Sequence, residues 1–256
     1  MKLIIEEESK ISTFIDIFRN LKEMIDEMNI HFSSDGVYSQ CLDRNHVALY
    51  ELRLEPSWFK EYTCSKAIVL GINNNLLFRI LNCYQKGHIL EFNVDDDGDR
   101  FHISFDGGED SNVTCKKFQI PLMDIDIEML NVPDTDYSVD VKLETKTYVD
   151  IIQEMKNFHT NVKVDLKPEA IQLDANGEEG RMMVELDNFT EYAIEEDCND
   201  SILYSLKYLH WMCSFSKLSD EIELHFSKDL PMKMVYNLKN EKNYIRFFLA
   251  PKIEDY

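Results

Sequence analysis

The sequence predicts an α+β fold made of two similar domains, each with two helices packed on antiparallel sheet. Apolar residues recur at helical spacing in four stretches and alternate, or form short blocks, in the segments between them. The order of these elements in the first half, strand, helix, four strands, helix and further strands, is repeated in the second half. Between the halves lies the acidic stretch 120–137, where Pro121 and Pro133 predict extended chain because proline neither continues a helix nor donates to a strand ladder.

In the first half, apolar residues three and four positions apart predict a helix, with Ser9 as its candidate N-cap: Phe14, Ile17, Phe18, Leu21, Met24, Ile25 and Met28. Asp35-Gly36 predicts a hairpin turn. A shorter helix is indicated by Leu76, Leu77, Ile80 and Leu81. Strands are expected at residues 2–8, 29–33, 37–41, 46–54 and 66–70, on both sides of 95–99, and at 112–120.

In the second half, two helical stripes are expected, the first formed by Tyr148, Ile151, Ile152, Met155 and Phe158, the second by Ile202, Leu206, Leu209 and Cys213. Strands are expected at 137–143, 162–166, 170–173, 182–186, around Tyr192, and at 222–226, 232–238 and 244–249. The predicted organisation is therefore an N-terminal domain at 1–121, a connecting loop at 122–138 and a C-terminal domain at 139–256.

The composition is that of a globular protein with a sizeable core, because 44% of the residues are apolar and 11% aromatic. The 48 acidic residues outnumber the 27 basic ones and give a formal net charge of −21, which favours solubility and disfavours wide contact with nucleic acid or membrane. No apolar run approaches the ~20 residues of a membrane span, and the N-terminus lacks a signal-peptide pattern, so a soluble intracellular protein without a membrane partner is expected. The six cysteines form no Cys-x-x-Cys pair, which favours reduced, mostly buried thiols over disulfides or metal ligands.

Three segments resemble the sliding clamp of eukaryotes, the proliferating cell nuclear antigen family: Gln40-Cys-Leu-Asp-Arg-Asn-His-Val-Ala-Leu49, Pro121-Leu-Met-Asp-Ile-Asp-Ile-Glu-Met-Leu130 and Phe247-Phe-Leu-Ala-Pro-Lys-Ile-Glu254. The resemblance extends over nearly the whole chain. It implies the DNA-clamp fold, with three subunits forming a ring, helices lining a central hole for duplex DNA and sheets outside. The connecting loop 122–138, called the connector below, would lie on the outer front face. The resemblance also implies a nuclear, non-enzymatic protein that needs no cofactor, or a viral member acting in the host nucleus or at a viral replication site.

The distribution of charge bears on the DNA-facing role that the resemblance implies. Residues 62–90 and 201–219 contain no acid, and each stretch holds a predicted helix with basic residues. Without the resemblance, solvated helical faces with a few lysines explain this pattern. With it, the expected DNA-facing residues are Lys10, Lys22, Arg79, Lys86, Lys146, Lys156, Lys207 and Lys217.

Several positions that are basic in the family's pore are not basic here: Ile15, Asp16, Asp150, Gln153 and Ser214. A pore with fewer cations makes fewer phosphate contacts and holds DNA loosely, with weak binding to short linear duplex that is lost at moderate salt. Enclosure of the duplex, rather than affinity, would then retain the clamp, and sequence-independent contacts would permit sliding.

The resemblance also implies an apolar pocket for client peptides, which insert a helical turn with aliphatic and paired aromatic anchors. The matching residues are Leu42, His46, Val47, Leu49, Leu130, Val132, Pro231, Phe248, Ala250, Pro251 and Ile253. For Val47 and Leu49, in a strand, core and pocket are both open. The pocket is favoured for the residues that lie in irregular polar segments, Leu130, Val132, Pro251 and Ile253.

Ring closure in the family joins an edge strand of one domain to an edge strand of the other, here residues 112–120 and 181–186. The expected interface residues are Cys115, Phe118, Met182 and Val184, although Phe118 is equally interpretable as an inward-facing core aromatic. Lys167 matches the family's modification lysine, and it is equally interpretable as an ordinary turn residue because Pro-Glu follows it in place of Asp-Gly.

No catalytic or metal-binding constellation is visible in the sequence. The run 95–99 is better explained as a charged hairpin turn than as a calcium loop, because no bidentate Glu follows at the required position and its flanks are expected strands. The expected function is a homotrimeric sliding clamp, a processivity factor for DNA polymerase in replication and repair that docks client proteins and is placed by a clamp loader. Two alternatives remain open: a checkpoint-type subunit in a hetero-oligomer, and a clamp-fold binding module that does not encircle DNA.

Overall fold

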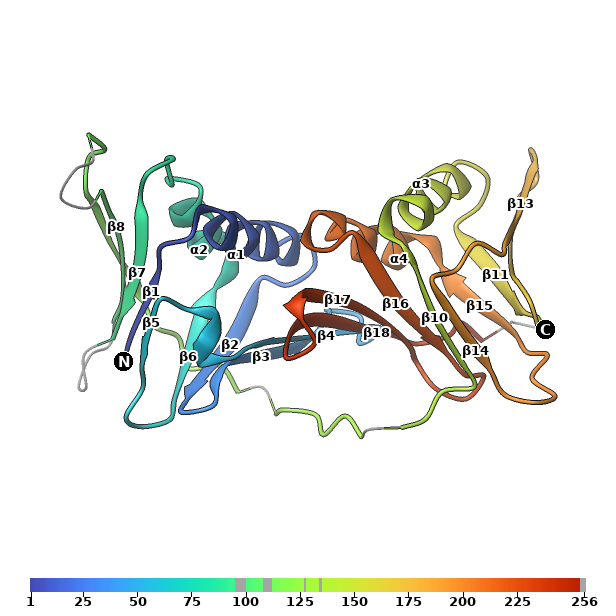
Figure 1. Ribbon diagram of the computed structural model, residues 1–256, viewed down its shortest axis with the longest axis horizontal. Helices are drawn as coiled ribbons and strands as arrows, with labels where there is room; N and C mark the ends of the chain where they lie inside the picture. Colours follow the sequence, from blue (N-terminus) through green and yellow to red (C-terminus); the bar gives the residue numbers. More distant parts are fainter. Residues whose placement is uncertain (95–99, 108–111, 127, 134, 254–256) are drawn as a thin grey trace. The chain divides into compact units, whose positions relative to one another are not determined.

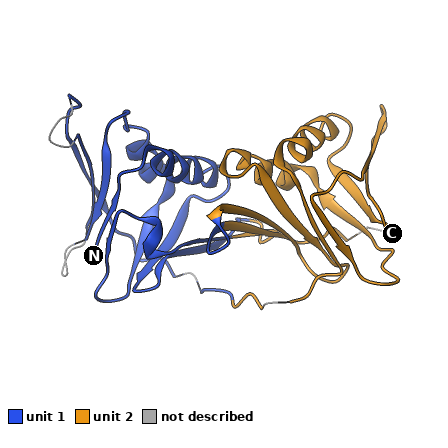
Figure 2. Ribbon diagram, in the orientation of Figure 1, with its two compact units in different colours: residues 1–44, 51–130, 240–244 blue, residues 45–50, 131–239, 245–256 orange. Residues whose placement is uncertain are grey.

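The computed structural model describes residues 1–94, 100–107, 112–126, 128–133 and 135–253. Its chain forms two compact units (Figure 2). Unit 1 comprises residues 1–44, 51–130 and 240–244, and unit 2 comprises residues 45–50, 131–239 and 245–256. The described part of each unit contains two α-helices and mainly antiparallel strands, which confirms the predicted α+β class. The order of elements repeats between the halves as predicted, but five strands rather than four lie between the two helices of each unit.

The helices of unit 1 are α1 (Glu8–Leu21) and α2 (Asn74–Leu81), and a 3₁₀ turn, η1, covers Pro56–Trp58. One sheet has the order β5-β1-β7-β8-β9, with β1 (Lys2–Ile5), β5 (Glu61–Thr63), β7 (Ile89–Asn93), β8 (Arg100–Asp106) and β9 (Lys116–Pro121). The other strands of this unit are hydrogen-bonded in the order β4-β3-β2-β6, with β2 (Glu27–Ser33), β3 (Gly36–Leu42), β4 (Ala48–Leu54) and β6 (Ile68–Asn73).

The helices of unit 2 are α3 (Thr145–Met155) and α4 (Leu206–Cys213), and a 3₁₀ turn, η2, covers Ser216–Leu218. One sheet has the order β13-β12-β11-β15, with β11 (Asn161–Leu166), β12 (Ile171–Asn176), β13 (Arg181–Leu186) and β15 (Ser201–Ser205). The other strands of this unit are hydrogen-bonded in the order β14-β10-β16-β17-β18, with β10 (Val139–Glu144), β14 (Glu191–Ile194), β16 (Glu221–Phe226), β17 (Met232–Asn240) and β18 (Asn243–Leu249).

In each unit the two helices pack side by side, α1 on α2 and α3 on α4 (Figure 1). Aromatic rings fill the space beneath them. In unit 1, Phe92 and Phe101 stack with their ring centroids 5.4 Å apart, and Phe14 of α1 lies 5.2 Å from Phe92. In unit 2, Phe247 lies 5.3 Å from Trp211 of α4. These contacts leave the opposite sides of the helices for polar residues.

The first helix is shorter than its apolar pattern predicts. α1 ends at Leu21, whereas Ile25 and Met28, both buried, lie beyond it, Met28 in β2. The chain turns where the amides of Glu23 and Met24 bond to carbonyls three residues back. Ser9 is not the N-cap, because the helix already begins at Glu8.

The fourth helix also begins later than predicted. Ile202 lies in β15, where it and Tyr204 alternate with outward residues and face the core, and α4 starts at Leu206. His46 was expected on a strand, but it precedes β4 with a positive φ of 57°. The turn between β2 and β3 is a two-residue hairpin in which Ser33 pairs with Gly36, and Gly36 has a φ of +118°.

Candidate functional site

The basic residues of unit 1 gather where α1 meets α2. The side chains of Arg19, in the last turn of α1, and of Lys22, the C-cap residue that follows this helix, both lie over the ring of Phe78 in α2, at 5.7 and 5.3 Å from its centroid. Arg79 follows Phe78 and is exposed. Arg19 pairs with Asp16, and Lys22 pairs with Glu23. Arg79, by contrast, makes no ion pair with any residue that the structure describes, so its charge is fully available to an anion.

Two other predicted DNA-facing residues of unit 1 have partners within the fold. The ammonium group of Lys10 donates to the carbonyl of Trp58 at 2.8 Å and lies 3.6 Å from the carboxylate of Glu7. Lys86 follows α2 and its Nζ lies 3.3 Å from the carboxylate of Glu8. Lys86 remains 83% exposed, whereas Lys10 is 22% exposed and is mainly a structural residue.

All four predicted cations of unit 2 are exposed, and they lie on or beside α3 and α4: Lys146, Lys156, Lys207 and Lys217. None of them forms an ion pair within the described part of the chain. Lys207 lies 5.7 Å from the ring centroid of Tyr208. Burial lowers the pKa of His210, and the positive charge of Lys156 lowers it further, so α4 gains no charge from this histidine near neutral pH.

The predicted loss of pore charge is explained differently at two positions. Ile15 is 6% exposed and belongs to the core of unit 1, so no cation is missing there from an exposed face. Asp16 pairs with Arg19, and thus reduces the positive potential near α1. The acid-free stretches correspond to α2 and α4, while α1 and α3 carry acids among their basic residues.

Most of the residues expected to bind client peptides belong to unit 2. The amide of Ala250 donates to the carbonyl of Val47 at 3.0 Å, which fixes the start of the C-terminal tail against the loop before β4. The amide of Lys252 then donates to the carbonyl of Leu203 at 2.8 Å. The tail therefore leaves β18 along a defined course up to Ile253, which is 89% exposed.

The remaining predicted pocket residues differ in exposure. Leu49 and Phe248 are 7% and 8% exposed, so little of either side chain is left for a ligand. Those that are exposed or half-buried in unit 2 are His46, Val47, Val132, Pro231, Ala250 and Pro251. The two pocket residues of unit 1 are Leu42, which is half-buried at the end of β3, and Leu130, which is 44% exposed in the connector.

Each unit has an edge strand that is unpaired on one side in the described chain. β9 ends the five-stranded sheet of unit 1, and β13 ends the four-stranded sheet of unit 2. Phe118 of β9 pairs in register with buried Ile103, and its ring packs edge-on against Phe105 with centroids 5.9 Å apart. Phe118 is thus on the inward face, where it is half-buried, and its role at a subunit interface stays a prediction.

Met182 and Val184 of β13 have the same character. They pair in register with buried Ala175 and Leu173, so they face inward, and both are half-buried at the edge. Cys115 precedes β9 and is exposed.

Two exposed apolar residues beside this edge were not among the predicted site residues, and one of them, Phe158, was expected in a helical stripe but lies beyond the end of α3 at Met155. Met183 is 56% exposed on the outer face of β13, and Phe158, 43% exposed, lies next to the turn that leads into β13. A side chain at Gly180 would meet the ring of Phe158 at 3.4 Å. Their apolar character at exposed positions was the only available signal.

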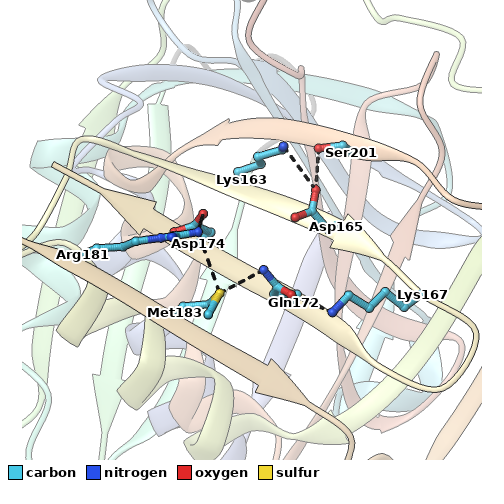
Figure 3. Close-up of polar contacts among 8 residues, drawn as sticks. All are labelled: Lys163, Asp165, Lys167, Gln172, Asp174, Arg181, Met183 and Ser201. Carbon is cyan, nitrogen blue, oxygen red and sulfur yellow. Dashed lines mark hydrogen bonds and ion pairs between the residues drawn. The ribbon is translucent and has the colours of Figure 1, made fainter.

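The outer face of the four-stranded sheet carries a polar network (Figure 3). Arg181 of β13 donates two hydrogen bonds to Asp174 at 2.8 and 2.7 Å, which lowers the pKa of that carboxyl. The sulfur of Met183 accepts from Gln172 at 3.0 Å, and Gln172 in turn accepts from Lys167 at 2.6 Å. These contacts stiffen β13 from its outer side and leave its free edge open.

Lys167 is held by acceptors on two neighbouring strands. Besides the oxygen of Gln172, its Nζ lies 3.1 Å from the carboxylate of Glu185. Its side chain is 39% exposed, and its carbonyl accepts from the hydroxyl of Tyr192 at 2.5 Å. A modifying enzyme would have to displace these contacts.

No group of three or more potential metal-binding side chains occurs within the described ranges. The acidic run 95–99, weighed as a calcium loop, lies outside the described residues. Among the described helices, none is both long and apolar enough to cross a membrane.

Sequence comparison accounts for both units. The N-terminal domain model of proliferating cell nuclear antigen matches residues 5–129, and the C-terminal domain model matches residues 131–252. The chain belongs to the proliferating cell nuclear antigen family. A relative from Chaetomium thermophilum, named proliferating cell nuclear antigen, is 28% identical over 258 residues, covering 98% of this chain and 97% of its own length. Proliferating cell nuclear antigens are non-enzymatic sliding clamps of DNA replication and repair, in agreement with the expectation of no catalytic site.

Proposed function

We propose that this chain is a homotrimeric DNA sliding clamp that makes a DNA polymerase processive and docks other replication and repair proteins. The observation that carries the proposal is the pair of free edges, β9 in unit 1 and β13 in unit 2. Because each chain carries both edges, β9 of one subunit can meet β13 of the next in a head-to-tail contact, and a series of such contacts closes into a ring when the rotation per subunit is suitable.

The side chains at these edges support their pairing. Phe118, Met182 and Val184 are half-buried on the inward faces of their strands. If β9 of one subunit pairs with β13 of the next, the inward apolar face continues across the junction and these side chains lose their remaining exposure. Phe158 and Met183, apolar and exposed beside β13, add to the surface that such a junction would cover.

The exposed cations on the helices would contact the DNA backbone. Arg79, Lys146 and Lys207 contribute charge without an internal ion pair among the described residues. Their small number, in a chain of net charge −21, makes the attraction weak and strongly salt-dependent. A closed ring tolerates this weakness because its topology retains the DNA, and phosphate contacts without base readout allow sliding.

Client peptides would dock on the connector and the C-terminal tail. Exposed Leu130 and Ile253, with half-buried Val132 and Pro251, offer apolar contact, and the surrounding acids favour peptides with basic flanks. DNA polymerase is the proposed principal client, a clamp loader would open the ring, and the nucleus is the proposed location. The proposed domain limits are 1–121 and 139–256, joined by the connecting loop 122–138.

The ring is tested by sedimentation velocity over a wide range of protein concentration. The wild-type chain should sediment as a trimer, and Phe118→Asp should shift it to a monomer by placing a charge at the junction. Val69→Asp is the matched control, because Val69 is an apolar residue 55% exposed on β6. A wild-type monomer at every concentration would refute self-closure and favour the hetero-oligomeric alternative.

The clamp activity is tested by polymerase extension on a primed circular template and on a linear template with free ends. Stimulation on the closed template alone, with a loader present, is the expected result. Equal stimulation on both templates would indicate a binding module that does not encircle DNA.

A further inference from the structure

The connector is fastened to unit 1 near its start by buried groups. The amide of Met123 donates to the carbonyl of Gly71 in β6 at 2.9 Å, and a Cβ added to Gly71 would lie 2.1 Å from the oxygen of Met123. Two residues later, the side chain of Asn29, which is 7% exposed, donates to the carbonyl of Ile125 at 3.0 Å. The backbone of the connector therefore follows β6 and β2 closely.

The last attachment within unit 1 is made by one side chain. Gln40 of β3 is 5% exposed, and its amide group binds both backbone polar atoms of Leu130. Its Nε2 donates to the carbonyl of Leu130 at 3.0 Å, and its Oε1 accepts from the amide of Leu130 at 2.8 Å. A primary amide presents one donor and one acceptor in the spacing of a peptide group, so Gln40 acts as a single rung of strand pairing.

This contact fixes the backbone of the connector at a point where two large apolar side chains are exposed. Met129 and Leu130 are 56% and 44% exposed, although both are large and apolar. Exposed side chains on an irregular segment would normally sample many positions, and a ligand would have to restrict them. The amide of Gln40 removes much of that freedom in advance, because the side chain that holds Leu130 is itself buried and confined to β3.

We propose that Gln40 is a positioning residue for client recognition, which holds Leu130 in place as a preformed apolar anchor. The inference rests on the proposed docking function and deepens it. A partner that finds the anchor already ordered loses less conformational entropy on binding. Because the amide of Leu130 donates to Gln40, a client engages Leu130 through its side chain and does not take that amide as a strand-pairing donor.

Hydrogen exchange tests the contact without any ligand. Gln40→Leu removes both hydrogen bonds at similar size, and Gln40→Glu keeps an acceptor for the amide but removes the donor to the carbonyl. Exchange at the amide of Leu130 should be about tenfold faster or more in Gln40→Leu, the factor expected when a hydrogen bond of ordinary net strength is lost. Gln85→Leu, a change at an exposed glutamine in the same unit, should leave it unaltered.

Peptide titration tests the consequence. The probe is a fluorescein-labelled synthetic peptide with one aliphatic and two adjacent aromatic anchors and lysine flanks. Affinity should fall in the order wild type, Gln40→Glu, Gln40→Leu, with a loss of about tenfold in the last. Leu130→Ala should weaken binding in the wild-type background and have a much smaller effect in the Gln40→Leu background, because the anchor is no longer held there.

The outcomes separate the two proposals. If the wild-type chain does not bind the probe, the docking function fails. If it binds and the effects of Gln40→Leu and Leu130→Ala simply multiply, or the exchange of Leu130 is unchanged, the positioning role is refuted while docking stands. Circular dichroism and thermal unfolding identify a variant that does not fold. If Gln40→Leu does not fold, the double-mutant cycle of Gln40→Glu with Leu130→Ala tests the positioning role instead.

Discussion

Replacing Arg79 by alanine tests one proposed DNA contact in a fold that does not depend on this residue. Arg79 is exposed on α2 and forms no ion pair with the described residues, so its removal should leave the stability within about 0.5 kcal/mol of wild type. In a trimer the substitution removes three cations from the ring. If each contacts a phosphate, the slope of log K against log salt becomes shallower by about 0.9 per contact, or about 2.7 in total.

The size of this effect makes it measurable. Over a fourfold rise in salt, a slope of about 2.7 corresponds to a factor of about 40 in affinity, so the wild-type affinity should fall about 40-fold more than that of the variant. Fluorescence anisotropy of a labelled duplex at a series of salt concentrations measures it. Arg53→Ala is the matched control, because Arg53 is also exposed but lies on β4. Equal slopes for wild type and both variants would show that α2 does not face DNA.

Three further predictions concern the fold. Gly36→Ala should lower the free energy of unfolding by more than about 1 kcal/mol, since the φ of +118° at this position is unfavourable for alanine and the added Cβ would lie 2.1 Å from the oxygen of Leu54. Urea unfolding measures the change, and an unchanged midpoint would contradict the turn geometry. Phe247→Ala should cost about 3–5 kcal/mol in the same assay, because the ring is fully buried among other aromatic rings, and a loss below 1 kcal/mol would mean that the site collapses around it. Arg181→Gln should reduce the loss of unfolding free energy that occurs as the pH falls into the acid range. Arg181 lowers the pKa of Asp174 below its ordinary value of 3.8, so the ion pair stabilises the fold above that pH and loses its effect as the pH falls through the lowered pKa. Wild type and Arg181→Gln should therefore differ in urea midpoint at pH 6 and converge as the pH falls through the lowered pKa of Asp174, whereas a difference that persists once this carboxyl is protonated would assign the effect to packing.

The number and type of elements could be predicted from the sequence because burial leaves a periodic signal. The signal reports burial rather than conformation, and this explains the errors at Ile25, Met28 and Ile202. All three are buried at spacings that suit a helix, yet Ile202 and Met28 reach the core from strands. Where a helix gives way to a strand that packs on the same core, the spacing of apolar residues alone does not locate the boundary.

The candidate site was predictable in its composition and not in its contacts. The exposed cations on α2 and α4 could be predicted because the sequence has no acidic residue in the stretches that contain these helices. The hydrogen bond from Lys10 to the carbonyl of Trp58, and the one from Gln40 to Leu130, join residues 48 and 90 positions apart. Nothing local at either end indicates its partner, since such contacts depend on how the strands and connector are brought together.

The proposed pairing of β9 with β13 implies that ionic strength has opposite effects on the assembly of this protein and on its binding to DNA. Each chain carries a net charge of −21, so in the proposed assembly two chains would repel one another at long range and attract only at the short range of strand pairing. Added salt screens that repulsion and should promote assembly, while the same salt weakens the hold of the helices on phosphates. If the chain assembles as proposed, ring closure and the contact with DNA would have different salt optima, and the salt that best favours the closed ring would also let it move most freely on DNA.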